Sequence, residues 1–196
     1  MGVSIMSKPW EQLLSDAVDA MIHHEPYAKA IMPQHTQNTP SRVVEAFKEM
    51  LSGYEVDVGQ MLTSALFPRS TYTQMVHVTD ITFYSLCAHH LIPFSGTVHF
   101  AYLPGVYLIG LSKIPRLVDA IARRLQIQEI MTDQIVDAFV QYVKPEGCGI
   151  AVRASHGCMQ CRGVKAQTSK TLTTALRGAF SNNDLTRQEF LSSIKG

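Results

Sequence analysis

The chain has 196 residues, which is enough for one domain of ordinary size with a buried hydrophobic core. Its 17 Lys and Arg nearly balance its 16 Asp and Glu, so there is no overall field that would attract nucleic acid or an anionic membrane. Apolar residues fall in short periodic stretches, none of which reaches the roughly 18 consecutive apolar residues of a membrane span. We therefore expect a cytoplasmic protein with no nucleic-acid or membrane partner, in which any anion site is local.

Two helices are predicted at the start of the chain. Residues 10–22 place apolar side chains on one helical face after Pro9, and their acidic residues argue against a secretory signal. Residues 23–38 contain two prolines and are typical of a loop. In the pair Thr39-Pro40 threonine can cap a helix and proline suits the first turn, which predicts a second helix ending near Leu51.

Strands and helices then follow in pairs. The β-branched content of residues 75–83 and the alternation in residues 97–103 predict two strands. Ser112 can cap a helix whose apolar face extends to Leu125, and a further helix covers residues 135–143. Four elements remain: an apolar strand at 148–154, a strand near 156–166, a helix at about 169–180, and a last helix opened by the capping box Thr186-x-x-Glu189.

This order of elements predicts an α+β protein in which an antiparallel β-sheet carries helices on one face. We expect this domain to cover residues 71–196, behind an N-terminal helical extension that covers residues 1–70.

Cysteine and histidine gather at two places that are far apart in the sequence. Cys87, His89 and His90 lie within four residues, and Cys158 and Cys161 lie on a later element. Zinc accepts both thiolate and imidazole ligands. Four protein ligands would make a closed structural site, whereas three would leave a position open for water. The spacing does not decide between His89 and His90 as the ligand.

Strand alternation favours the open site. If residues 156–163 form a strand, the side chains of His156, Cys158 and Arg162 point to one face and that of Cys161 points to the other. A polar face of this composition is unusual for a core and suits a catalytic wall.

The other histidines and cysteines have simpler interpretations. His23 and His24 are typical of a surface, Cys148 lies between two glycines in an apolar strand and reads as core, and His77 and His99 have no nearby donor. The sequence also lacks the His-x-Glu and Pro-Cys-x-x-Cys signature of the zinc deaminases, and it contains neither a phosphate loop nor a dinucleotide fingerprint.

Four segments together resemble the motifs of the GTP cyclohydrolase I family, in the same order. They are residues 85–96, which include Cys87 and His90, and residues 110–116, 123–129 and 156–163. The similarity covers most of the chain from about Met75 to Ile194 and is weak before Thr39. The resemblance implies a tunnelling fold (T-fold), in which subunits join their sheets into an oligomeric barrel. It further implies a homo-oligomer, a decamer of two pentameric rings, with GTP as substrate and active sites at subunit interfaces.

The resemblance also implies roles for particular residues. The family's zinc ligands match Cys87, His90 and Cys158, which excludes Cys161 and agrees with strand alternation. The residues that match proton-transfer groups are His89 and His156. The residues that match substrate contacts are Glu129 for the guanine edge, Lys113, Arg116 and Arg162 for the triphosphate, and Gln128 and Ser112 for further contacts.

Several positions depart from the family pattern. Ile130 stands where an arginine is usual, Cys161 where methionine is usual, Pro115 where a small helix former is usual, and Glu45 where a lysine is common. These departures affect the expected phosphate contacts and leave the zinc ligands intact. Two alternatives to a GTP cyclohydrolase remain: a zinc-stabilised binding or assembly module without turnover, and a related purine-ring hydrolase that stops at an opened intermediate.

Overall fold

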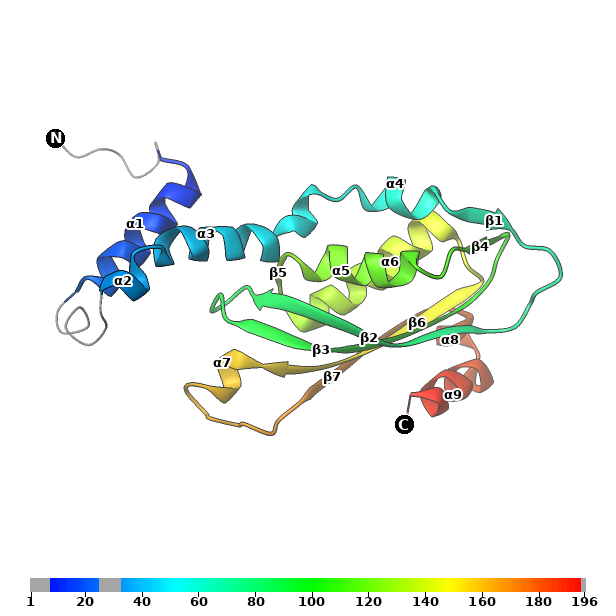
Figure 1. Cartoon of the computed structure of the whole chain (residues 1–196). Helices are drawn as coiled ribbons and strands as arrows, with labels where there is room; N and C mark the ends of the chain where they lie inside the picture. The colour runs from blue at the N-terminus through cyan, green and yellow to red at the C-terminus, as the bar shows by residue number, and fades with distance from the viewer. Residues whose placement is uncertain (1–7, 25–32, 195–196) are drawn as a thin grey trace. The chain divides into compact units, whose positions relative to one another are not determined.

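A computed structural model of the chain describes residues 8–24 and 33–194 (Figure 1). The chain divides into two compact units, which meet in sequence between Leu51 and Ser52. The boundary predicted after residue 70 falls inside the second unit. We describe each unit by itself.

The first unit is helical. It contains α1 (Trp10–Ile22), the single turn α2 (Pro33–Thr36) and α3 (Thr39–Met50). Helices α1 and α3 pack together, and each buries one valine, Val18 and Val44. The first of the long helices was predicted from its apolar periodicity and the second from the helix-start signal at Thr39-Pro40. Within the predicted loop at 23–38, residues 25–32 lie outside the described part of the chain.

The second unit begins with short elements that the sequence left unassigned. They are the 3-10 helix η3 (Ser52–Glu55), α4 (Val58–Thr63) and the short strand β1 (Leu66–Pro68), which pairs antiparallel with β4 (Tyr107–Ile109). The side chain of Asp57 caps α4 by accepting a hydrogen bond from the backbone N–H of Gln60.

A five-stranded sheet forms the centre of the second unit, in the order β5-β2-β3-β6-β7. Its strands are β2 (Val76–Cys87), β3 (Pro93–Leu103), β5 (Leu125–Gln126), β6 (Gly147–His156) and β7 (Thr171–Gly178). The four longer strands pair antiparallel, and only the two-residue strand β5 runs parallel to its neighbour β2.

Two helices cover one face of this sheet: α5 (Lys113–Ala122) and α6 (Gln128–Val143) (Figure 1). The core between them and the sheet includes Phe83, Phe100, Phe139 and Ile150. The predicted α+β class with a mainly antiparallel sheet is confirmed, but helices pack on both faces of the sheet and not on one alone. The chain ends with α8 (Ala179–Asn182) and α9 (Asp184–Ser193), whose buried residues Phe180 and Phe190 cluster with Ala101 and Ala151 from the opposite face of the sheet.

The C-terminal elements differ from the prediction. Strand β6 already ends at His156, the single-turn helix α7 (Gly157–Gln160) follows, and the last strand is Thr171–Gly178, where a helix was expected. The run of β-branched threonines at the start of this strand fits its alternating, half-exposed pattern better than a helix. Helix α9 begins at Asp184 under an Asn183 cap, and not at the predicted Thr186 capping box.

Among the described helices, none combines the length and the apolar character needed to cross a bilayer.

Candidate metal centre

A tight loop after β2 brings Cys87 and His90 together. The backbone N–H of Cys87 bonds to the carbonyl of Ile92 at 3.1 Å, and that of Leu91 bonds back to the carbonyl of Cys87 at 2.8 Å. Leu91 adopts a positive φ of 53° in this turn. Cys87 Sγ then lies 3.8 Å from His90 Nδ1. The short strand β5 ties the loop to the sheet, because the carbonyl of Gln126 accepts from the N–H of Ala88 at 2.9 Å.

Cys158 reaches the same place from the end of β6. Strand pairing sets His156 opposite Phe94, and α7 begins at the next residue. At Gly157 a Cβ atom would lie 2.7 Å from Cγ2 of Ile92 and 2.8 Å from the carbonyl oxygen of Pro93. The close approach of α7 to the Cys87 loop therefore depends on a residue without a side chain.

The ligand atoms of Cys87, His90 and Cys158 all lie within 4.8 Å of one another. We call these residues the Cys-His-Cys group. Cys87 is buried, Cys158 half-buried and His90 exposed, so the group is open on one side. Cys161 ends α7, is exposed and is not part of the group.

The reason given from the sequence for separating the two cysteines was wrong. It assumed that residues 156–163 form a strand, whereas Cys158 lies in a helical turn that Cys161 ends. Cys158 nevertheless lies close to Cys87 and His90, as predicted. Strand β6 ends beside the Cys87 loop, and the close packing at Gly157 places α7 against that loop.

The donor set fits a metal that prefers sulfur and nitrogen ligands. Burial raises the pKa of the Cys158 thiol, and the adjacent Cys87 raises it further because two neighbouring thiolates repel each other. A divalent cation would remove this repulsion, since it binds both thiolates directly. Three protein donors would leave a fourth tetrahedral position free.

Replacing Gly157 by alanine should weaken metal binding without removing a ligand. The new methyl group would collide with Ile92 and with the backbone of Pro93, so α7 must move away from the Cys87 loop. We expect the metal affinity to fall about 10- to 100-fold, as for other changes that misorient ligands. Competition with a chromophoric chelator measures this. Gly110→Ala is the matched control, because its Cβ would meet no atom closer than 3.5 Å. Equal affinities in the two variants would contradict the prediction.

His156 lies beside the Cys-His-Cys group with its ring held on two sides. Its Nε2 is 2.8 Å from Oε1 of Gln128, and its ring stacks on Phe94 with a centroid distance of 4.6 Å and an interplanar angle of 9°. Burial lowers the pKa of His156, and the negative charge of Glu129 opposes this shift. The site therefore favours a neutral imidazole more than water does.

His89 and Arg162 lie on the exposed side. His89 is exposed in the loop after Cys87, and its ring centroid is 6.2 Å from that of His90. Arg162 follows α7, and its Nη1 lies 3.2 Å from His90 Nε2. Both predicted residues are thus near the Cys-His-Cys group.

The first turn of α6 supplies two more of the predicted residues. Glu129 is exposed and close enough to His156 to influence its pKa. Gln128 is buried, and all the hydrogen bonds of its amide go to protein groups. Ile130, the departure from the family pattern, is half exposed beside them.

The remaining predicted residues lie elsewhere in the chain. Ser112 and Lys113 are at the beginning of α5, and Lys113 Nζ donates to Ser64 Oγ at 3.0 Å. Helix α5 has ten residues and leads into β5 beside Cys87, so its beginning is about 15 Å from the metal end. Arg116 lines a cavity of about 230 Å³ together with Asp119 and Arg123, away from the cysteines.

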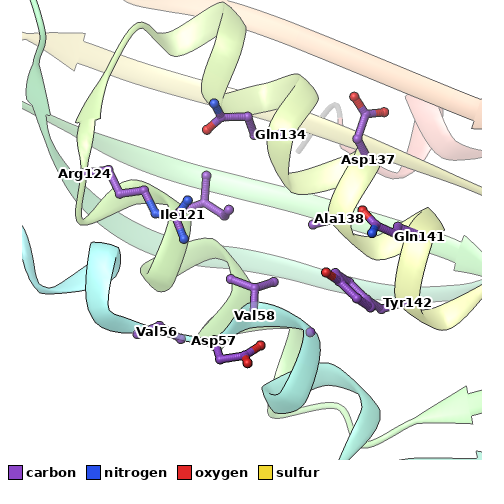
Figure 2. A pocket seen from close by; sticks show the side chains of 11 residues that line it. Val56, Asp57, Val58, Ile121, Arg124, Gln134, Asp137, Ala138, Gln141 and Tyr142 are labelled. Carbon is purple, nitrogen blue, oxygen red and sulfur yellow. The ribbon is translucent and has the colours of Figure 1, made fainter.

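A larger hollow of about 540 Å³ lies over the outer side of α5 and α6. Figure 2 shows its lining, which includes Asp57, Arg124, Asp137 and Tyr142. None of the predicted site residues lines it.

Sequence reasoning missed Phe94, on which His156 stacks, and Thr173, which bonds to Gln128 behind it. Phe94 belongs to one of the four motifs but received no role, and Thr173 lies in a segment that was expected to be helical. The register of β3 against β6, which sets Phe94 opposite His156, was the missing information.

The fold and the Cys-His-Cys group define an α+β protein that could hold a metal ion beside a partly buried histidine. The family model for GTP cyclohydrolase I matches residues 21–195. GTP cyclohydrolase 1 of Campylobacter lari is 45% identical over 189 residues, which are 96% of each chain. The Campylobacter curvus protein of that name is 53% identical over 80% of this chain and 82% of its own. The Leptospira biflexa protein of that name is 48% identical over 80% of this chain and 85% of its own. The chain belongs to the GTP cyclohydrolase I family.

Proposed function

We propose that this chain is a GTP cyclohydrolase I, which converts GTP and water to formate and 7,8-dihydroneopterin triphosphate. The observation that carries the proposal is the convergence of Cys87, His90 and Cys158, with donor atoms within 4.8 Å, beside His156. Family membership supports this reaction, and the open Cys-His-Cys group supports a metal-dependent form of it. We infer that the metal is Zn²⁺, since two thiolates and an imidazole are typical zinc ligands. Zinc at this centre would supply activated water at neutral pH.

His156 and His89 are the proposed proton-transfer groups. Opening the imidazole ring of GTP requires a proton for the departing ring nitrogen, and a histidine can give and recover a proton near neutral pH. The environment of His156 favours its neutral form, so the ring can accept a proton before donating one.

Glu129 is the proposed guanine-recognition residue. A carboxylate can accept hydrogen bonds from two neighbouring N–H groups of guanine, and adenine does not offer this pair. Glu129 is exposed and lies near His156, so a guanine held by it would lie close to the reacting centre. Gln128 is a weaker candidate for a further substrate contact, because its amide is already hydrogen-bonded to Val152 and His156.

Lys113, Arg116 and Arg162 are proposed to bind the triphosphate, with Ser112 as a further contact. Lys113 and Arg116 lie in the first turn of α5, where the helix dipole favours phosphate. Arg162 is near the Cys-His-Cys group, but Lys113 is about a helix length away from it within one chain.

This separation supports a site that is shared between subunits. A second copy could place its α5 beside the Cys-His-Cys group of the first. Among the described strands, β7 pairs on one side only, so it offers an edge to which a neighbouring subunit could add. We propose a homo-oligomeric barrel, a decamer of two pentameric rings, with its active sites at the subunit interfaces.

Turnover of GTP is the direct test. Zinc-loaded protein given GTP should release formate and, after oxidation, a fluorescent pterin in equal amounts. Protein stripped of metal by a chelator should release neither, and restoring Zn²⁺ should restore both. The absence of formate from folded, zinc-loaded protein would contradict the proposal and favour a binding module. Formate-free ring-opened nucleotide, detected by product mass, would indicate a hydrolase that stops early.

A further inference from the structure

The buried amide of Gln128 has only one workable orientation. Gln128 is 1% exposed, and its Nε2 lies 3.0 Å from the carbonyl oxygen of Val152 and 3.2 Å from that of Thr171. Carbonyl oxygens only accept hydrogen bonds, so the NH₂ group must face them. Reversing the amide would set its oxygen against two carbonyl oxygens inside the protein, which is costly.

Two threonine hydroxyls give the same orientation. Thr132 Oγ1 is 2.7 Å from the backbone oxygen of Gln128 and therefore donates its single proton there. Thr173 Oγ1, which is 2.7 Å from Thr132 Oγ1, must then be the donor in that contact. Its lone pairs remain available to accept from Gln128 Nε2, which is 3.1 Å away.

The fixed amide determines where the proton of His156 sits. With its NH₂ group directed at the strands, Gln128 presents Oε1 to His156 Nε2 at 2.8 Å. An amide oxygen cannot donate, so Nε2 must carry the hydrogen. Stacking on the buried ring of Phe94 holds the imidazole in the plane that this bond requires. In the neutral ring, Nδ1 then has the free lone pair, and no hydrogen bond of Nδ1 occurs among the residues that the structure describes.

We propose that Gln128 is a positioning residue that holds His156 as the Nε2–H tautomer, with the ring lone pair on Nδ1. The role of the tautomer in turnover rests on the proposed function, whereas the tautomer itself does not.

This role differs from the substrate contact expected from the family resemblance. The N–H groups of the Gln128 amide already face protein acceptors, so a guanine could reach only the second lone pair of Oε1, on a side chain that is 1% exposed. Strands β6 and β7 hold the amide through Val152, Thr171 and His156. We expect the substrate to meet His156 and not the amide behind it.

Nitrogen-15 NMR of histidine-labelled, zinc-loaded protein tests the tautomer without any substrate. At about pH 8.5 an ordinary imidazole is neutral, and protonated and bare ring nitrogens have clearly different chemical shifts. We expect His156, assigned by comparison with His156→Gln, to carry its hydrogen on Nε2. In Gln128→Met the acceptor is lost, so the spectrum should shift toward a mixture of tautomers. Gln126→Met is the matched control, because Gln126 is equally buried but bonds to Ile121 and Gln134 instead.

The outcomes separate this inference from the proposed function. A wild-type His156 with its hydrogen on Nδ1 would overturn the inference, even if Gln128→Met fails to fold. An unchanged tautomer in a folded Gln128→Met variant would overturn it as well. With GTP, we expect Gln128→Met to lower kcat about 10- to 100-fold with KM within about twofold. A raised KM at unchanged kcat would instead identify a substrate contact. The expected tautomer in a protein that makes no formate would leave the inference intact and contradict the proposed function.

Discussion

Replacing Cys158 by alanine should empty the metal centre and stop formate release. The variant keeps only two ligands, Cys87 and the exposed His90. Zinc sites in proteins have three or four protein ligands, so two are too few to hold the ion. We expect the affinity for Zn²⁺ to fall by more than about 100-fold, because loss of a direct ligand exceeds the effect of outer partners. Metal content after dialysis, formate yield and circular dichroism measure occupancy, turnover and folding separately.

The chain offers its own control for this experiment. Cys161 lies three residues later, is exposed and is outside the Cys-His-Cys group. Cys161→Ala should therefore keep both the metal and turnover. If Cys161→Ala loses the metal and Cys158→Ala retains it, Cys161 is the ligand and Cys158 is not. Loss in both variants would indicate a closed site with four ligands and no position for water.

Replacing His156 by alanine should keep the metal and nearly abolish turnover. The imidazole is separate from the Cys-His-Cys group, and its contacts are Gln128 and Phe94. Removing a positioned proton-transfer group costs about 10²- to 10⁴-fold in rate. We expect a loss in this range in kcat for formate release, with zinc content close to that of the wild type.

His23→Ala is a suitable comparison, because His23 is the exposed residue that follows α1 at its C-cap and is not part of the proposed machinery. It should behave as the wild type in both measurements. A His156→Ala protein that loses zinc would identify this histidine as a ligand. A variant that holds zinc and still turns over at the wild-type rate would remove His156 from the mechanism.

Local patterns were sufficient to predict most of the fold. Helix α5 repeats its apolar residues on one face, and β2 and β3 alternate or are rich in β-branched residues. The segment that became β7 was mistaken for a helix because it mixes threonines with alanine and leucine. Its strand state depends on pairing with β6, which is a tertiary interaction that no short window contains.

The site was predictable in part for the same reason. Cys87 lies within three residues of both His89 and His90, so spacing predicted a nearby histidine, and the family resemblance pointed to His90. Cys158 comes from the distant end of β6, and it reaches Cys87 and His90 from a helical turn where a strand was predicted. The bond between Gln128 and His156 joins a helix to a strand end, and only the packed structure reveals it.

Strand β7 also bears on how this protein must be handled. Its eight residues contain no proline, and its single charge, Arg177, is engaged by Asp133 and Asp137. Leu172 is exposed on it. Natural edge strands are commonly blunted by proline, lysine or a bulge, and an edge without them is a template for aggregation. A chain whose β7 edge is left uncovered should therefore be prone to form β-sheet aggregates, so that whatever covers this edge also determines solubility.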